Sequence, residues 1–227
     1  MHVLSIDTAL AACSAAVLDT ASGEILAAES MPMERGHAEA LVPLIDRVMQ
    51  AAGRNFSDLD RIAVTTGPGS FTGLRVGIAA ARGFGVATKM PVVGVSTLAA
   101  FAAPYLAEDG SSPVIVAIDA RHQHVYLHAF DGEGRTLVAP RLAPLVEAVR
   151  AASETSCRLV GSSAVAVAEA MADNAPGPYI VDDTPAPDIG WVARIGAVLP
   201  RADAAPKPQY LRAPDAQPQN AAQLPRR

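Results

Sequence analysis

The chain contains few residues of several types, and each shortage narrows what the protein can be. Its two cysteines, Cys13 and Cys157, lie far apart in apolar stretches, which predicts buried, reduced thiols of an intracellular protein. Lysine occurs only as Lys89 and Lys207, and 18 basic against 23 acidic residues give a formal net charge of −5. A chain that grips nucleic-acid phosphates normally carries a basic face, so RNA binding by this chain alone is disfavoured. No apolar run is long enough to span a membrane.

Length and composition indicate a globular chain with a large core. The 227 residues are 50% hydrophobic and 18% charged, which suits one large domain or two small ones that share a core. Apolar alternation and turn residues predict the elements. Strands are expected over residues 2–7, 13–18, 24–30, 61–66, 91–95, 114–119, 122–130, 136–141 and 179–181, and helices over 37–52, 74–88, 97–106, 143–151, 163–172 and 189–199.

The chain divides into two similar halves. Each half opens with an apolar strand that ends in aspartate, at Asp7 and at Asp119, and continues with further strands and helices. We therefore predict a first lobe over residues 1–107 and a second over 108–212. Residues 201–227 are rich in proline, alanine and glutamine, so this end is expected to be extended or mobile, with 213–227 forming a tail.

The most distinctive stretch is the glycine-rich run Gly67–Gly77, between a predicted strand and a predicted helix. It lacks the lysine of a phosphate-binding P-loop, and Gly67, Gly69 and Gly73 are one residue too widely spaced for the dinucleotide fingerprint. An anion at the helix N-terminus stays open. The alternative is a tight strand-to-helix turn in which Ser70 or Thr72 caps the helix.

The helix after this run has a face of small residues. Gly73, Gly77, Ala81 and Gly85 recur every four residues and so share one side of the helix. A glycine inside a helix costs about 0.5–1 kcal/mol relative to alanine, and such a cost is tolerated where another backbone comes very close. The sequence leaves open whether that backbone belongs to this chain or to a partner.

Taken together, the glycine run and four other stretches resemble the TsaB (YeaZ) family, whose members are accessory proteins in making threonylcarbamoyladenosine on tRNA. The resemblance covers about residues 1 to 212 and includes Ile6–Thr8, His37–Ile45, Asp119–Arg121 leading into Val125–Tyr126, and Pro208–Arg212. It implies an α/β fold of the actin-like ATPase (ribonuclease H-like) type, with two lobes that each contain a mixed, five-stranded-type sheet and flanking helices.

Compared with actin-like ATPases, the nucleotide site is degenerate. The turn after the first aspartate-ended strand reads Asp7-Thr8-Ala9 and lacks the glycine that lets a phosphate approach, and the turn after Asp119 also lacks one. Asp7, Thr8 and Asp119 are therefore candidates for remnants of an ATP site, or for strand-end residues bonded to nearby turns. We expect no cofactor, with any ATP binding weak or confined to a complex.

The catalytic relative in this resemblance, TsaD, binds a metal through His-x-Glu-x-His. The corresponding residues here are Thr97, Ala99 and Phe101. Neither alanine nor phenylalanine can coordinate a metal ion, so we expect no metal site and no catalytic residue. His37-Ala-Glu39 lacks a second histidine, and His37 is interpreted as a helix-start residue. His122, His124, Tyr126 and His128 alternate, which predicts a strand face turned to solvent or to a partner.

The resemblance implies a non-catalytic subunit. It would pair with TsaD and act with the ATPase TsaE in transferring a threonylcarbamoyl group to the adenosine beside the anticodon, touching tRNA only through the complex. The alternative is an actin-like ATPase or kinase acting on its own. The helices over 37–52 and 73–88 are expected to dock the partner, and to pair with their own copies when the partner is missing. The predicted interface residues are Leu41, Ile45, Gly73, Leu74, Gly77, Ile78 and Ala81.

Overall fold

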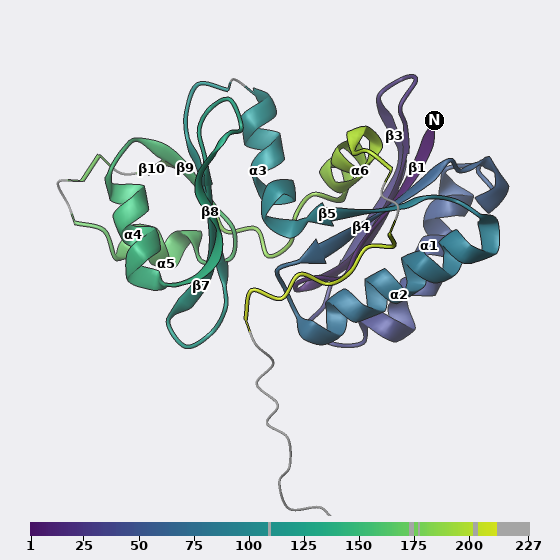
Figure 1. Cartoon of the computed structure of the whole chain (residues 1–227), viewed down its shortest axis with the longest axis horizontal. Coiled ribbons are helices and arrows are strands. Elements are labelled where there is room, and N and C mark those ends of the chain that lie inside the picture. Colours follow the sequence, from purple (N-terminus) through teal and green to yellow (C-terminus); the bar gives the residue numbers. More distant parts are fainter. Residues whose placement is uncertain (109, 173–174, 177, 202–203, 213–227) are drawn as a thin grey trace, which may run out of the picture.

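The computed structural model describes residues 1–227 except 109, 173–174, 177, 202–203 and 213–227. Two lobes lie side by side, each built on a five-stranded sheet (Figure 1). The strands are β1 (His2–Asp7), β2 (Ala12–Asp19), β3 (Glu24–Pro32), β4 (Arg61–Gly67), β5 (Val92–Ser96), β6 (Val114–Asp119), β7 (His124–Phe130), β8 (Thr136–Pro144), β9 (Cys157–Val160) and β10 (Pro178–Asp182). The helices are α1 (His37–Ala51), the short 3-10 helix η1 (Phe56–Asp58), α2 (Phe71–Thr88), α3 (Thr97–Glu108), α4 (Leu145–Ser153), α5 (Ala164–Glu169) and α6 (Ile189–Val198).

The two sheets have the same connectivity. In the first, β1, β2 and β3 form an antiparallel meander, β4 pairs parallel to β1, and β5 pairs parallel to β4. The second sheet repeats this plan with β6, β7 and β8 as the meander and with β9 and β10 as the parallel strands. This duplicated mixed sheet confirms the predicted fold class.

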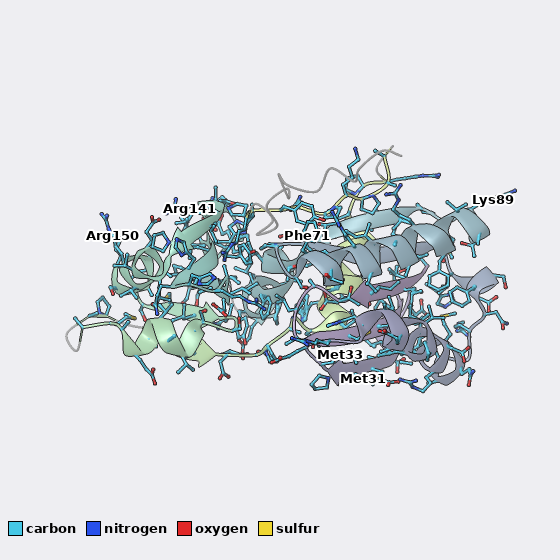
Figure 2. All side chains as sticks on the ribbon, turned by 90° about the horizontal axis from the view of Figure 1, so that it is seen from below. Met31, Met33, Phe71, Lys89, Arg141 and Arg150 are labelled. Carbon is cyan, nitrogen blue, oxygen red and sulfur yellow. The ribbon has the colours of Figure 1, made fainter. Side chains whose placement is uncertain are left out.

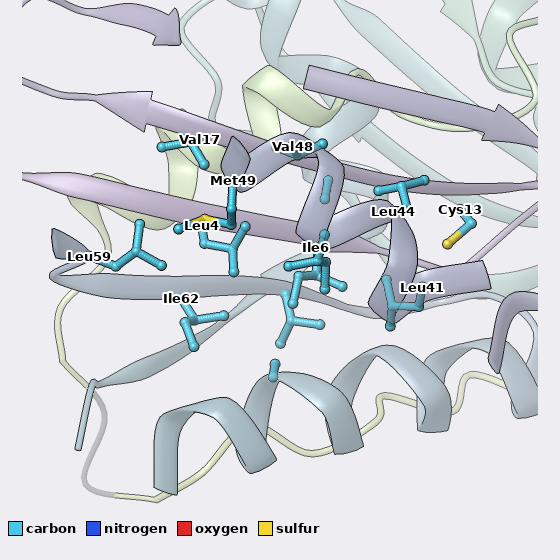
Figure 3. Packing of buried hydrophobic residues seen from close by; sticks show 14 of the residues in the cluster. Leu4, Ile6, Cys13, Val17, Leu41, Leu44, Val48, Met49, Leu59 and Ile62 are labelled. Carbon is cyan, nitrogen blue, oxygen red and sulfur yellow. The ribbon is translucent and has the colours of Figure 1, made fainter. Parts of the chain in front are cut away.

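In the first lobe, the sheet is covered on both faces. α1 and α2 lie side by side on one face, and α6 lies on the other (Figure 1). On α1, Leu41 and Val48 are buried against Leu4 and Ile6 of β1 (Figure 3), and Ile45 belongs to the same cluster. β1 is buried on both sides from Val3 to Asp7, as expected for a central strand between two helical layers.

Two helices join the lobes. In α3, Ala100 packs in the first lobe's cluster with α6, whereas Leu98 and Phe101 pack on the second sheet. α6 follows the second sheet in sequence but returns to the first, where a Cβ on Gly196 would lie 2.2 Å from the Cβ of Ala63. The strands of the first sheet all lie before the predicted lobe boundary at 107/108, and those of the second sheet all lie after it. α6 is an exception, because its residues fall within the predicted second lobe but it packs on the first sheet.

The C-terminal segment over residues 201–227 is predicted to be extended or mobile. Residues 204–212 are irregular but held against the two lobes: the Gln209 amide donates to the Thr66 carbonyl over 2.7 Å, and Arg212 donates to the Ala120 carbonyl. Residues 213–227 lie outside the described part. Among the described residues, no helix has the length and apolarity needed to cross a membrane.

Candidate functional site

The first candidate site is the turn after β1, where the structure buries Asp7 completely. Its Oδ1 accepts hydrogen bonds from the Thr65 hydroxyl and from the Ala9 amide at 3.1 Å, whereas Oδ2 has no partner. Burial raises the pKa of this carboxyl above its usual value, and the hydrogen bonds oppose this rise only in part. Asp7 is therefore bonded to the turn that follows it and to β4.

The backbone that would cradle a phosphate in an actin-like ATPase is covered by the chain's own glycine run. A Cβ on Gly69 would lie 2.3 Å from the Ala9 carbonyl oxygen, and one on Gly73 would lie 2.0 Å from that of Thr8. The Thr8 hydroxyl donates to the Gly73 carbonyl over 2.7 Å, and the Ser70 amide donates to Ala9. The glycines of the run thus allow it to pack directly on the turn that follows β1.

The glycine-rich run contains the start of helix α2. Ser70 is the N-cap of α2, and its hydroxyl accepts from the Gly73 amide at 3.3 Å, which fulfils one of the two capping predictions. α2 begins at Phe71, three residues earlier than predicted. The tight-turn alternative therefore describes the local structure.

A cleft of about 630 Å³ separates the strand-end turns of the two lobes. Ala9, Gly69 and Ser70 line one side, and Asp119 and Arg121 line the other. Asp119 is exposed, and its Oδ1 accepts from the Arg121 amide at 2.8 Å. Asp119 thus faces the cleft, whereas Thr8 is bonded to α2 and Asp7 is enclosed in the first lobe.

The predicted interface residues do not lie on the surface, which corrects the expectation that they form the docking face. All seven are buried in the chain itself: Leu41, Ile45, Gly73, Leu74, Gly77, Ile78 and Ala81. The close approach that the small residues allow is to the turn after β1, because a Cβ on Gly77 would lie 2.5 Å from the Thr8 hydroxyl oxygen. A Gly77→Leu substitution would therefore disturb folding rather than pairing alone.

The opposite faces of α1 and α2 are exposed and partly apolar. Val42 on α1 and Phe71 and Val86 on α2 are exposed, and Figure 2 shows Phe71 at the end of α2 nearest the second lobe. Gly83 also lies on this side and has open space where a Cβ would stand. The chain's own packing therefore does not require glycine at position 83. We call Val42, Phe71, Gly83 and Val86 the outer face.

The position that corresponds to the metal ligands of TsaD lies at the start of α3. Thr97 and Phe101 are buried there, in the interior between the lobes, and Ala99 is partly buried. Their side chains offer no nitrogen or carboxylate ligand. Among the described residues, no group of three or more histidine, cysteine, aspartate or glutamate side chains is arranged to hold a metal ion.

The prediction of a histidine strand face is wrong. His122 lies in the turn before β7 with a φ of 53°, and only His124 is partly exposed on the strand. Tyr126 and His128 are buried, and burial lowers the pKa of His128 below its usual value. β7 is covered on both faces, because Val125 and Leu127 pack in the cluster that contains α4, whereas Tyr126 packs in the cluster that contains α3. His37 does begin α1, and its Nε2 lies 3.1 Å from the Leu10 carbonyl.

Sequence reasoning missed the contact between the C-terminal segment and α2. The Tyr210 ring packs at a tilt of 33° against Phe71 with ring centroids 4.9 Å apart, and its hydroxyl accepts from the Arg75 Nε at 3.1 Å. The Arg75 guanidinium lies 3.6 Å from the Phe71 ring centroid. Position 210 lies within the stretch Pro208–Arg212 that carried part of the family resemblance, which was the available signal.

Comparison with known proteins supports one family. A model described as "TsaD: tRNA N6-adenosine threonylcarbamoyltransferase" matches residues 31–182. The chain is 38% identical over 127 residues to the tRNA threonylcarbamoyladenosine biosynthesis protein TsaB of Escherichia coli, a match that covers 56% of this chain and 53% of that protein. It thus matches only about half the length of that relative.

Longer matches cover nearly the whole chain. An uncharacterized protein of Mycobacterium tuberculosis is 34% identical over 218 residues, which is 95% of this chain and 94% of that one. A Pseudomonas aeruginosa protein, described as similar to peptidase YEAZ, superposes with a TM-score of 0.76 at 30% identity and covers 93% of this chain and 99% of that one. These matches show that the chain belongs to the TsaB/YeaZ family, and the duplicated mixed sheets and the glycine run packed on the turn after β1 agree with them.

Proposed function

We propose that this chain is a non-catalytic accessory subunit in the transfer of a threonylcarbamoyl group to the anticodon-adjacent adenosine of tRNA, paired with a TsaD protein and acting with the ATPase TsaE. The observation that carries the proposal is the chemistry at Thr97, Ala99 and Phe101. The catalytic relative TsaD binds a metal at the corresponding positions. In this chain, the three side chains at these positions have no nitrogen or carboxylate ligand, and Thr97 and Phe101 are buried in the core. Catalysis then has to come from a partner.

The covered phosphate cradle supports the same proposal. Thr8 and Ala9 are buried beneath the run that starts at Gly69, so a phosphate that approaches this turn meets protein backbone instead of free amide groups. The alternative, an ATPase or kinase acting on its own, needs that cradle to be open. Calorimetry with ATP and Mg²⁺, together with a phosphate-release assay on the isolated chain, separates the two. Tight binding with turnover would favour the enzyme.

The outer face is the surface that we propose for the partner. Its exposed apolar side chains lie on two neighbouring helices, and Gly83 has open space where a second helix can come close. The equivalent pair of helices in the TsaD partner would complete a four-helix bundle on this side. This surface replaces the seven buried residues as the basis of the docking proposal.

A matched pair of valines tests the docking surface. Val86, near the end of α2, is 82% exposed, and Val198, at the end of α6 on the opposite face of the first sheet, is 83% exposed. Val86→Glu is expected to abolish co-purification with TsaD, because the carboxylate would be buried without a partner. Val198→Glu, equally exposed, is expected to leave pairing unchanged.

The outcomes are distinguishable. If wild type fails to co-purify with TsaD, and if cells without the chain keep threonylcarbamoyladenosine in their tRNA by nucleoside mass spectrometry, the proposed function is wrong. If wild type pairs and Val86→Glu pairs equally well, the function stands and the docking surface is wrong. Circular dichroism of each variant shows that a loss of pairing does not come from unfolding.

A further inference from the structure

The segment of residues 206–212, which we call the strap, crosses from the first lobe to the second. At the first lobe, the Gln209 amide donates to the carbonyl of Thr66 at the end of β4. The Gln209 carbonyl oxygen fills the space beside Gly67, because a Cβ on Gly67 would lie 2.6 Å from this oxygen. Pro206 likewise lies against Gly94 of β5. Two glycines of the first sheet thus leave room for the strap.

A second set of contacts fastens the strap to α2. The Tyr210 ring packs at a tilt against Phe71, and the guanidinium of Arg75 both donates to the Tyr210 hydroxyl and lies over the Phe71 ring. Aromatic and cation–π contacts of this kind are attractive. The end of α2 nearest the second lobe is therefore bound to the strap by side chains as well as by backbone.

The strap then reaches the second lobe within a few residues. Leu211 packs on the cluster that contains Ile118 and Tyr126, and Arg212 donates to the Ala120 carbonyl in the turn after β6. Three residues of extended chain span at most about 11 Å, and the Arg212 side chain adds its own length because its guanidinium makes the second contact. The distance between the Gln209 anchor and the Arg212 anchor is therefore limited unless one of them breaks.

The strap also borders the cleft. Gln209, Tyr210, Leu211 and Arg212 all line it, between the turn after β1 on one side and the turn after β6 on the other. From these contacts we infer that the strap is a tether that fixes the separation of the two lobes and hence the width of the cleft. Its two anchors are coupled through the short chain between them, so loosening either one loosens the other.

Hydrogen exchange and a spin-label distance test this coupling. Nitroxides on Gln50→Cys of α1 and Arg150→Cys of α4 report the lobe separation, because the native cysteines are buried and do not compete for label. Tyr210→Ala and Arg212→Ala are each expected to shift the distance distribution to longer and broader values. Each is also expected to speed amide exchange both at residues 66–75 and at 118–124. Lys207→Ala, at an exposed position of the same segment, is expected to change neither.

The inference is overturned if each substitution speeds exchange only at its own anchor, or if the distance distribution stays as in wild type. Tyr210→Phe keeps the ring and removes only the acceptor for Arg75, so it provides a milder variant if Tyr210→Ala fails to fold. It should give a smaller shift in the same direction at both anchors. The experiment uses the isolated full chain, so its outcome does not depend on the proposed partner.

Discussion

At the scale of single residues, Asp7 is the clearest case of a group whose chemistry is set by its surroundings. It closes β1, as strand-end aspartates of actin-like ATPases do, yet it is fully buried with an unpartnered Oδ2. An isolated carboxylate is costly in such a site. The ionised form of Asp7 therefore lowers the stability of the folded state, whereas the neutral form does not.

The raised pKa of Asp7 predicts a pH dependence of stability. Because burial raises the folded-state pKa of Asp7 above the usual value of an aspartate carboxyl, the free energy of unfolding falls as pH rises from about that usual value through the folded pKa. Asp7→Asn removes the charge and can keep the contacts at Oδ1. It is expected to be more stable than wild type at pH 7, with the difference vanishing near pH 4. Urea unfolding across this range measures it, with the exposed Asp46→Asn as control.

Substitution by alanine is expected to have opposite effects on the free energy of unfolding at two glycines of α2. Gly73→Ala would place a methyl group against the Thr8 carbonyl oxygen, so it is expected to lower the free energy of unfolding by about 1–3 kcal/mol through overpacking. Gly83→Ala meets open space and is expected to raise it by about 0.5–1 kcal/mol through helix propensity. Thermal unfolding of the two variants checks both signs. Equal effects would contradict the assignment of the two faces of α2.

At the scale of elements, α6 depends on a residue far away in sequence. Arg61, the first residue of β4, donates to the carbonyls of Gly196, Ala197 and Leu199 at the end of α6. The last carbonyls of a helix have no partner within the helix, and a cation there also favours the helix dipole. Arg61 thereby fastens the end of α6 to the sheet that it covers.

Removal of the Arg61 cap is expected to lower the stability of the protein and to loosen α6 first. Arg61→Met keeps the aliphatic stem and removes the donors, so it is expected to cost about 1–3 kcal/mol in the free energy of unfolding and to speed amide exchange in residues 189–199. Arg150→Met on α4 is the control, because the pair of Arg150 with Glu154 is largely exposed and contributes little. If Arg61→Met has as small an effect as the control, the capping role is contradicted.

At the scale of the whole molecule, the lobes share structure rather than only a linker. α3 contributes side chains to the cores of both lobes, and α6 returns from the second lobe to the first. Such shared packing makes separate unfolding of the lobes costly, because either lobe alone would expose a face of α3.

We therefore predict a single cooperative unfolding transition. Trp191, the only tryptophan, lies on α6 and reports on the first lobe, whereas far-ultraviolet circular dichroism reports on the whole chain. The two probes should give the same midpoint in urea. A tryptophan transition separate from the dichroism transition would mean that the lobes unfold independently.

Much of the fold could be predicted from the sequence because apolar periodicity and turn residues act locally. The strands that end at Asp7 and Asp119 and the helix that begins at His37 were predicted and are found. The histidine face failed because alternation on a strand says nothing about which face is covered. α3 and α4 pack on opposite faces of β7, so Tyr126 and His128 are buried. No local pattern says which segments will cover a strand.

The candidate site divides in the same way. The sequence by itself determined that Gly67–Gly77 is not a P-loop, that Thr97, Ala99 and Phe101 offer no nitrogen or carboxylate ligand, and that a backbone must come close to the small face of α2, because these follow from the chemistry and spacing of the residues. Only the tertiary structure decided that this backbone is the chain's own turn after β1, that Asp7 is sealed from the cleft, and that residues 206–212 contact both lobes. Spacing along a helix fixes which residues share a face, whereas what covers that face depends on contacts between segments far apart in the chain.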